Sequence, residues 1–372
     1  MRGLARQFAE KEITPYAAAW DRSEELDRSI VARLGEVGFL GATIPIEYGG
    51  QGLDHMSYCL LVEELGRADS SVRGVVSVSL GLVAETIAKW GTDEQRYKWL
   101  PGLSAGSSIG CFGLTEPSTG SDAANLQCRA VRDSGEWVIT GQKMFITNGT
   151  WADLALIFAR TGDQGAKGIT AFVVPTTSNG FHAKAIKGKL GLRAQDTAEL
   201  FLDHVRVDDR ASLGGIGGGF KVAMSALDNG RLSLAAGSVG IGQAALDAGI
   251  EYAKVRIQFG RPIASFQLVQ ELLADVHVEV EAARLLTWRV ARLADANQRH
   301  TVESSAAKYY ASEMAVRASN AALQIFGGYG YIDEYPVGKY LRDARVMTLY
   351  EGTSQMHKLL IGRALTGESA FS

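Results

Sequence analysis

Apolar residues recur at three- and four-residue spacing through most of the first hundred residues. The pattern is clearest over residues 57–65 and 83–90, and this spacing places apolar side chains on one face of a helix. Gly91 and Thr92 are predicted to end one helix and begin the next, because glycine is common at helix C-termini and threonine at N-caps. We therefore assign residues 1–108 to an N-terminal helical domain.

The pattern changes near residue 109. Alternating or short β-branched runs follow, and they predict strands at 137–140, 154–159, 169–174 and 199–207. Residues 109–213 are therefore assigned to a central β domain.

Long helical patterns return after a cluster of glycines at 214–219. They cover residues 222–256, 267–297, 302–326 and 354–365, and four helices of this length predict a bundle over residues 214–372. Gly237, Gly240 and Gly242 fall inside the first of these helices, where each glycine is unfavourable by up to about 1 kcal/mol relative to alanine. Tight helix packing, or a ligand pressed against the helix, would explain them. The fold class is thus α+β, mostly α.

Composition narrows the possible functions. The formal charge is -3, from 38 basic and 41 acidic residues without a basic block, which argues against nucleic acid as a partner. The three cysteines and six histidines form no metal-ligand spacing, so no metal site is predicted. No apolar run approaches the roughly 18 residues of a membrane span, and the N-terminus resembles a charged helix. We expect a soluble, cytoplasmic protein.

Two segments carry candidate chemistry. Glu351 stands between two helical patterns, next to Gly352 and beside Thr353, a possible N-cap. An acid at such a junction often only stabilises the helix N-terminus. Residues 111–122, however, combine glycines, hydroxyls and backbone donors in one stretch, and Phe145 and Thr147 add an aromatic face and a hydroxyl. Together they are suited to the polar edge of a flat heterocycle.

The whole chain resembles the acyl-CoA dehydrogenase flavoprotein family. The resemblance rests on FGLTEPSTGSD (112–122), KMFITNG (143–149), RIQFGRP (256–262), QIFGGYGY (324–331) and YEGTSQ (350–355), in that order. It implies a helical N-terminal domain, a central β-barrel-like domain and a C-terminal four-helix bundle, usually assembled as a homotetramer. It also implies an FAD cofactor.

The resemblance implies a role for each matching residue. The flavin end of FAD would contact one set of residues, its phosphate and adenosine end a second set, partly across a subunit boundary, and Thr353 and Gln355 would complete the site. The first set is Phe112, Leu114, Thr115, Ser121, Phe145 and Thr147, and the second is Arg256, Phe259, Gln267, Gln324, Gly327 and Gly328.

Glu351 would be the general base. In the family this residue removes the proton α to a thioester while the β-carbon delivers hydride to flavin N5, and hydrogen bonds to the thioester oxygen make that proton acidic enough. The implied substrate is an acyl-CoA, and the implied electron acceptor is an electron-transfer flavoprotein. The implied substrate-binding positions, besides those below, are Ser121, Asp228, Arg231 and Gly352.

Arg73 and Ser77, one helical turn apart, resemble the carboxylate-binding pair of glutaryl-CoA dehydrogenases. A buried arginine needs an anionic partner, which suggests a short dicarboxylic acyl thioester, with or without decarboxylation. Alternatively, Arg73 pairs with Asp69 on its own helix and never meets the substrate.

The carrier of the acyl group and the type of activity stay open at this point. The acyl group could be carried by an acyl carrier protein of extender-unit biosynthesis instead of CoA. The chain could be an acyl-CoA oxidase, or a helical scaffold protein that keeps the fold without the activity.

Overall fold

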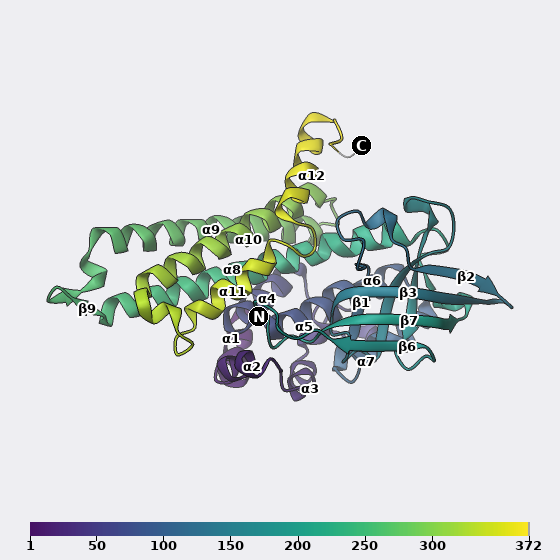
Figure 1. Cartoon of the computed structure of the whole chain (residues 1–372), viewed down its shortest axis with the longest axis horizontal. Coiled ribbons are helices and arrows are strands. Elements are labelled where there is room, and N and C mark those ends of the chain that lie inside the picture. The colour runs from purple at the N-terminus through teal and green to yellow at the C-terminus, as the bar shows by residue number, and fades with distance from the viewer. Residues whose placement is uncertain (371–372) are drawn as a thin grey trace.

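The computed structural model describes residues 1–370 and divides into the helical, β and helical parts expected from the sequence (Figure 1). The N-terminal part is built from helices. Their bounds are α1 (Arg2–Glu12), α2 (Ala17–Ser23), α3 (Ser29–Glu36), α4 (His55–Ala68), α5 (Ser70–Val76), α6 (Glu85–Trp90) and α7 (Asp93–Ala105), with a π-helical segment η3 (Ser77–Ala84) joining α5 to α6.

Side-chain caps set several of these helix starts. Asp54 accepts a hydrogen bond from the Ser57 amide at the start of α4. At the start of α7, Thr92 and Gln95 form a reciprocal capping box. The predicted break at Gly91 and Thr92 is therefore confirmed.

The segment from α5 through η3 to α6 is a core helix. Ser70–Trp90 is long and apolar enough to cross a membrane by length and composition alone, yet 89% of its most apolar stretch is buried inside the fold. We expected no apolar run as long as a membrane span. That expectation was wrong for Ser70–Trp90, which is long and apolar enough. Burial among other elements explains why most of this segment is apolar, although it also carries Arg73 and Glu85.

The central part is a mixed sheet with strand order β6-β7-β3-β2-β4-β5-β8, and β1 pairs with β4 in parallel. The strands predicted from alternation lie within β3, β4, β5 and β7. The bounds are β1 (Gly110–Gly113), β2 (Arg129–Asp133), β3 (Glu136–Thr147), β4 (Leu154–Arg160), β5 (Ile169–Pro175), β6 (Phe181–Ala185), β7 (Thr197–Val207) and β8 (Ser212–Leu213).

The C-terminal part is a bundle that runs from the sheet to the far end of the molecule (Figure 1). A short hairpin, β9 (Ile257–Gln258) and β10 (Arg261–Pro262), lies at that far end, and α12 projects from the body. The helices are α8 (Gly219–Val255), α9 (Gln267–Asp295), α10 (Thr301–Phe326), α11 (Val337–Met347) and α12 (Ser354–Thr366).

Glycines let α4 and α8 cross closely. A Cβ on Gly240 would lie 2.2 Å from the Glu63 carbonyl oxygen, and a Cβ on Gly66 would lie 2.7 Å from the Gly237 carbonyl oxygen. A Cβ on Gly237 would also lie 2.9 Å from the Arg73 side chain. Tight packing therefore explains these helical glycines, and Gly237 additionally leaves room for a buried guanidinium.

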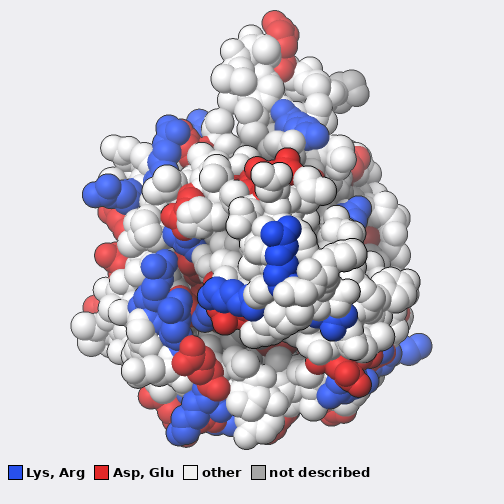
Figure 2. Space-filling model, turned by 90° about the vertical axis from the view of Figure 1, so that its left-hand side faces the viewer, with Lys and Arg blue, Asp and Glu red and all other residues white. Residues whose placement is uncertain are grey.

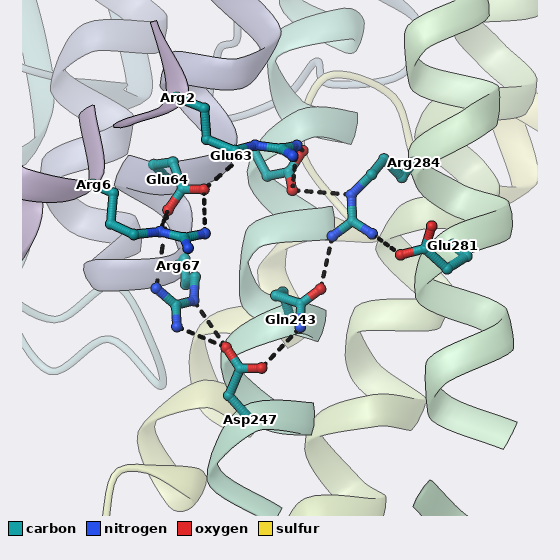
Figure 3. Close-up of polar contacts among 9 residues, drawn as sticks. All are labelled: Arg2, Arg6, Glu63, Glu64, Arg67, Gln243, Asp247, Glu281 and Arg284. Carbon is teal, nitrogen blue, oxygen red and sulfur yellow. Dashed lines mark hydrogen bonds and ion pairs between the residues drawn. The ribbon is translucent and has the colours of Figure 1, made fainter. Parts of the chain in front are cut away.

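A polar cluster ties α1, α4, α8 and α9 together (Figure 3). Arg284 is buried and its Nε donates to Glu63 at 3.0 Å, while Arg67 donates to Asp247 at 2.7 Å. Each arginine in the cluster has an acidic partner, so the charges are satisfied within the protein. The full set is Arg2, Arg6, Glu63, Glu64, Arg67, Gln243, Asp247, Glu281 and Arg284.

The surface at the far end of the bundle carries both signs of charge. Figure 2 shows acidic and basic side chains interspersed over this face, with apolar and neutral areas between them. This matches the nearly balanced count of 38 basic and 41 acidic residues.

Candidate active site

Glu351 lies in the turn between α11 and α12. Its backbone is left-handed, with φ of 54°, and Gly352 follows with φ of 97°. A left-handed conformation is unfavourable for a residue with a side chain and persists only where the surroundings enforce it. Thr353 then caps α12 by accepting a hydrogen bond from the Met356 amide at 3.3 Å. The turn aims the Glu351 side chain inward rather than along the helix.

The Glu351 carboxyl group lies in a confined space. Its Oε2 atom is buried and has no hydrogen-bond partner among the described residues. A Cβ on Gly230 of α8 would lie 2.3 Å from Oε2 and 2.7 Å from Leu82. Only glycine at position 230 leaves room for the carboxyl group in this position.

Burial sets the protonation behaviour of Glu351. It raises the pKa of Glu351 to about 7, although Arg73, Lys308 and Arg231 act in the opposite direction. A carboxyl group with this pKa exchanges its proton near neutral pH, which is the range that a general base requires.

This raised pKa predicts a pH-dependent stability difference. Ionising Glu351 is harder in the folded state than in the unfolded chain, so its effect on stability becomes increasingly unfavourable between the unfolded pKa near 4.5 and about pH 7. We expect Glu351→Gln to melt at a higher temperature than wild type at pH 8 and at nearly the same temperature at pH 4. Equal differences at both pH values would contradict the buried, unpaired carboxyl group.

Arg73 is buried, with 1% of its surface exposed. Its Nη2 donates to the Tyr350 hydroxyl at 2.6 Å and its Nη1 to the Ser77 hydroxyl at 3.3 Å. Nε has no hydrogen-bond partner, and within residues 1–370 no carboxylate forms an ion pair with this guanidinium. Arg73 is thus a buried cation that is held only by neutral groups.

The alternative pairing of Arg73 with Asp69 is wrong. Asp69 instead accepts from the Ser71 and Val72 amides as the N-cap of α5, and its other oxygen lies 2.8 Å from Lys339 Nζ. Lys339 also bonds Asp343 at 2.6 Å. Asp69 is engaged by these partners, so Arg73 has no ion-pair partner among residues 1–370, although it acts electrostatically on Glu351.

Hydroxyl groups extend from Arg73 into the core. Ser77 Oγ lies 2.7 Å from Ser233 Oγ on α8, and the Tyr58 hydroxyl donates to Ser233 at 3.1 Å. Beside these groups an apolar cluster of Val78, Leu82, Ala226 and the half-buried Phe112 reaches from η3 and α8 to strand β1. Hydroxyl groups therefore surround Arg73, whereas Leu82 of the apolar cluster lies beside Gly230 and the Glu351 carboxyl group.

Asp228 and Arg231 lie one turn apart on α8 and form an ion pair at 2.8 Å. Thr301 also donates to Asp228 at 2.8 Å. The pair lies within electrostatic range of Glu351, since Arg231 lowers the pKa of that residue.

The predicted flavin-end residues lie on β1, on the loop that follows it and at the C-terminal end of β3, where the Met144 amide donates to the Thr115 carbonyl oxygen at 2.9 Å. Phe112 packs on Phe158 with ring centroids 4.9 Å apart, and Thr147 accepts from the Gln195 side chain at 3.1 Å. Phe145 lies in a bulge of β3, has φ of 61° and is 65% exposed. Leu114 and Thr115 are half-buried and Ser121 is exposed. An exposed phenyl ring that a bulge turns outward, with hydroxyls beside it, suits a flat, partly polar ring system.

A buried ion pair fixes the loop that carries several of these residues. Lys143 is fully buried and its Nζ lies 2.8 Å from Glu116 and 2.7 Å from the Phe158 carbonyl oxygen. Glu116 also accepts from the Gln127 and Cys128 amides. The pair thus clamps both ends of the 115–128 loop to the sheet.

We expect Lys143→Met to destabilise the protein by about 3–5 kcal/mol, because it leaves the Glu116 carboxylate buried without its cation. Denaturant unfolding followed by circular dichroism measures this loss. The double variant Lys143→Met/Glu116→Gln should recover part of it. A single variant as stable as wild type would show that the clamp contributes nothing.

The predicted adenosine-end residues lie elsewhere. Phe259 and Gly260 form the tip of the β9–β10 hairpin, Phe259 is 94% exposed, and Arg256 lies over the Tyr329 ring at 5.3 Å. The 37 residues of α8 separate this end from the sheet by about 55 Å. A single copy of the chain therefore does not bring the predicted flavin-end residues and the predicted adenosine-end residues into one site. At the far end are Arg256, Phe259, Gln267, Gln324, Gly327 and Gly328, whereas Thr353 and Gln355 adjoin Glu351.

Comparison with known proteins decides the family. The descriptions of the matching family models are acyl-CoA dehydrogenase N-terminal domain over residues 1–107, middle domain over 111–205 and C-terminal domain over 217–366. The chain belongs to the acyl-CoA dehydrogenase family. Members of this family are flavoproteins that use FAD, and this chain is accordingly a flavin-dependent oxidoreductase.

Relatives show how similar the chain is to characterised members. It is 41% identical to an acyl-CoA dehydrogenase of Bacillus subtilis over 99% of this chain and 97% of the relative. A glutaryl-CoA dehydrogenase structure from Mycobacterium smegmatis matches with a TM-score of 0.95 and 40% identity, covering 100% of this chain and 95% of the other. A butyryl-CoA dehydrogenase structure from Megasphaera elsdenii matches with a TM-score of 0.96 and 39% identity, covering 98% and 96%.

Several residues at the site were not anticipated from the sequence. Gly230 makes room for the Glu351 carboxyl group, Tyr350 bonds Arg73, and Lys308 of α10 donates to the Gly352 carbonyl oxygen at 2.6 Å. For Lys308 a signal existed, since the periodicity of α10 places it with Ala307 and Ala311 on the buried face.

Proposed function

We propose that the protein catalyses α,β-dehydrogenation of a short acyl thioester that carries a carboxylate at its far end, with Glu351 as the general base. The proposed substrate class, a thioester with a far carboxylate, rests on one observation. Arg73 is a buried guanidinium that forms no ion pair with a carboxylate of residues 1–370, and only neutral groups accept its hydrogen bonds. A substrate carboxylate would supply the missing charge, and a guanidinium binds a carboxylate through two parallel hydrogen bonds.

Glu351 has the properties that the proton transfer needs. Its buried oxygen has no competing partner, and its raised pKa of about 7 lets it accept a proton at neutral pH. A carboxylate alone is too weak to remove an ordinary α-proton, so the thioester oxygen must also be polarised. The family resemblance assigns the Glu351 backbone N–H to that task, and its left-handed turn holds the N–H in place.

A set of half-buried and exposed groups of the β part suits the flavin end of FAD. We assign this role to Phe112, Leu114, Thr115, Ser121, Phe145 and Thr147, supported by the outward bulge at Phe145. When bound, FAD supplies the acceptor for the electrons that leave the substrate β-carbon. The residues described here orient the thioester, exclude water and hold the proton at Glu351.

A second copy of the chain completes the cofactor site in this proposal. The Arg256 guanidinium and the exposed Phe259 ring suit a pyrophosphate and an adenine, but they follow the C-terminal end of α8, whereas Glu351 lies against Gly230 in its N-terminal third. Helix α12 also projects from the body with Leu365 79% exposed, as expected for a helix that packs on another copy. A homotetramer, with an electron-transfer flavoprotein as the acceptor, follows from the family resemblance.

The test is a screen of thioesters for flavin reduction without oxygen. We expect glutaryl-CoA to bleach the yellow flavin band faster than butyryl-CoA. A parallel sample with glutaryl-loaded acyl carrier protein identifies the carrier, carbon dioxide release reports decarboxylation, and peroxide release in air reports oxidase activity. A colourless protein, or no bleaching with any thioester, would refute the proposal.

A further inference from the structure

Lys308 is a buried lysine that the proposed reaction leaves without a role. It lies on α10, its side chain is completely buried, and its Nζ donates to the Gly352 carbonyl oxygen at 2.6 Å. That carbonyl belongs to the residue after Glu351, within the left-handed turn. This hydrogen bond therefore fixes the turn to helix α10.

Two other lysines, the buried Lys143 and the half-buried Lys339, show what is unusual about Lys308. Lys143 is paired with Glu116 at 2.8 Å, and Lys339 lies within 2.8 Å of both Asp69 and Asp343. Among residues 1–370, no carboxylate forms an ion pair with Lys308. A buried, unpaired ammonium group is costly, and burial accordingly lowers the pKa of Lys308 to about 7. The hydrogen bond to the Gly352 carbonyl oxygen does not by itself explain a lysine at position 308, since a neutral side-chain donor could also form it.

Three basic side chains, each on a different helix, act electrostatically on Glu351. Arg73 on α5, Arg231 on α8 and Lys308 on α10 all favour its ionised form. Near Lys308, Glu313 on α10 accepts from Ser354, and His357 on α12 is buried with its pKa lowered to about 3, so its ring stays neutral.

Two of the three cations are neutralised by other groups when the proposed substrate is bound. Arg231 pairs with Asp228 at 2.8 Å. Arg73 would pair with the substrate carboxylate. Lys308 is then the remaining cation, and it favours the ionised form of Glu351 as long as it is protonated, that is, up to its own lowered pKa of about 7.

We propose that Lys308 is a positioning residue for the dehydrogenation: it holds the Gly352 carbonyl, fixes the turn that presents Glu351, and keeps the Glu351 carboxyl group ionised in the enzyme–substrate complex. The inference rests on the proposed function. It assigns to Lys308 both a geometric and an electrostatic effect, and the two can be separated by substitution.

The test compares Lys308→Met, Lys308→Gln and wild type as FAD-loaded proteins. Glutamine keeps a hydrogen-bond donor without the charge, and methionine keeps neither. Lys358→Met is the matched control, because Lys358 lies on α12 over the Tyr309 ring but is exposed. The rate of flavin reduction by the best thioester is measured without oxygen from pH 6 to about pH 10, beyond the range in which Glu351 titrates.

We expect both Lys308 variants to shift the midpoint of the pH–rate profile upward by about one unit, so that rates fall about five- to tenfold at pH 7 and recover at high pH. Lys308→Met should in addition have a lower plateau than Lys308→Gln. Lys358→Met should follow wild type.

An unchanged midpoint in both Lys308 variants would overturn the inference. So would loss of folding in both variants while Lys358→Met stays intact, because Lys308 would then be purely structural. Failure of the proposed function is a different result, in which wild type itself shows no flavin reduction with any thioester.

Discussion

Glu351→Gln is expected to keep bound FAD and to lose flavin reduction by about a thousandfold or more, the scale on which general bases contribute. Glutamine has nearly the same shape as glutamate but cannot accept the α-proton. The space beside Gly230 accommodates either side chain, so the fold and the thioester site should stay intact. The measurement is the rate of bleaching of the flavin band after anaerobic mixing with the preferred thioester.

The matched control is Glu313→Gln. Glu313 lies on α10 close to the same turn, where it accepts a hydrogen bond from Ser354. Its replacement removes a neighbouring carboxylate without touching the proposed base, so it should reduce flavin at nearly the wild-type rate. If Glu351→Gln also reacted at the wild-type rate, another group would have to be the base.

Arg73→Ala is expected to reverse the substrate preference. Removing the guanidinium leaves the far carboxylate of glutaryl-CoA without its partner, and losing one member of a buried ion pair costs about 3–5 kcal/mol. We therefore expect kcat/KM for glutaryl-CoA to fall by a factor of about a hundred to several thousand. Butyryl-CoA has no such carboxylate and should lose little.

The electrostatic effect of Arg73 on Glu351 must be separated from this result. Arg73 also lowers the pKa of Glu351, so its removal raises that pKa, and the variant should be compared with wild type at about pH 10, well above the pKa of the base in both proteins. Equal losses for the two thioesters would mean that Arg73 serves Glu351 and not the substrate. An unchanged preference without loss would make Arg73 structural.

The order of helical, β and helical parts could be predicted because the apolar period changes along the chain. Strands β4 and β5 are almost fully buried and were recognised, whereas β2 and β6 are mostly exposed and carry little apolar signal. Helix α11 was missed because a charged residue, Asp343, lies on its buried face and interrupts the apolar pattern. Lys339 on the same helix forms an ion pair with Asp343.

At the site, residues within one turn of each other were predictable and long-range partners were not. The spacing of Arg73 and Ser77 indicated one helical face, and the two side chains are hydrogen-bonded. The competition for Asp69 by Lys339 could not be foreseen, because 270 positions separate them along the chain and only the fold brings them together. Periodicity places Lys308 on the buried face of α10, but its hydrogen bond to the Gly352 carbonyl oxygen, 44 positions along the chain, depends on the fold.

The structure of the Glu351→Gln protein with FAD and a bound, unreacted thioester tests the role of Glu351 most directly. We predict that the side chain at position 351 contacts the substrate α-carbon, while Arg73 binds the far carboxylate. If that side chain points to solvent, or the acyl chain enters from a direction that leaves position 351 out of reach of the α-carbon, Glu351 is not the base.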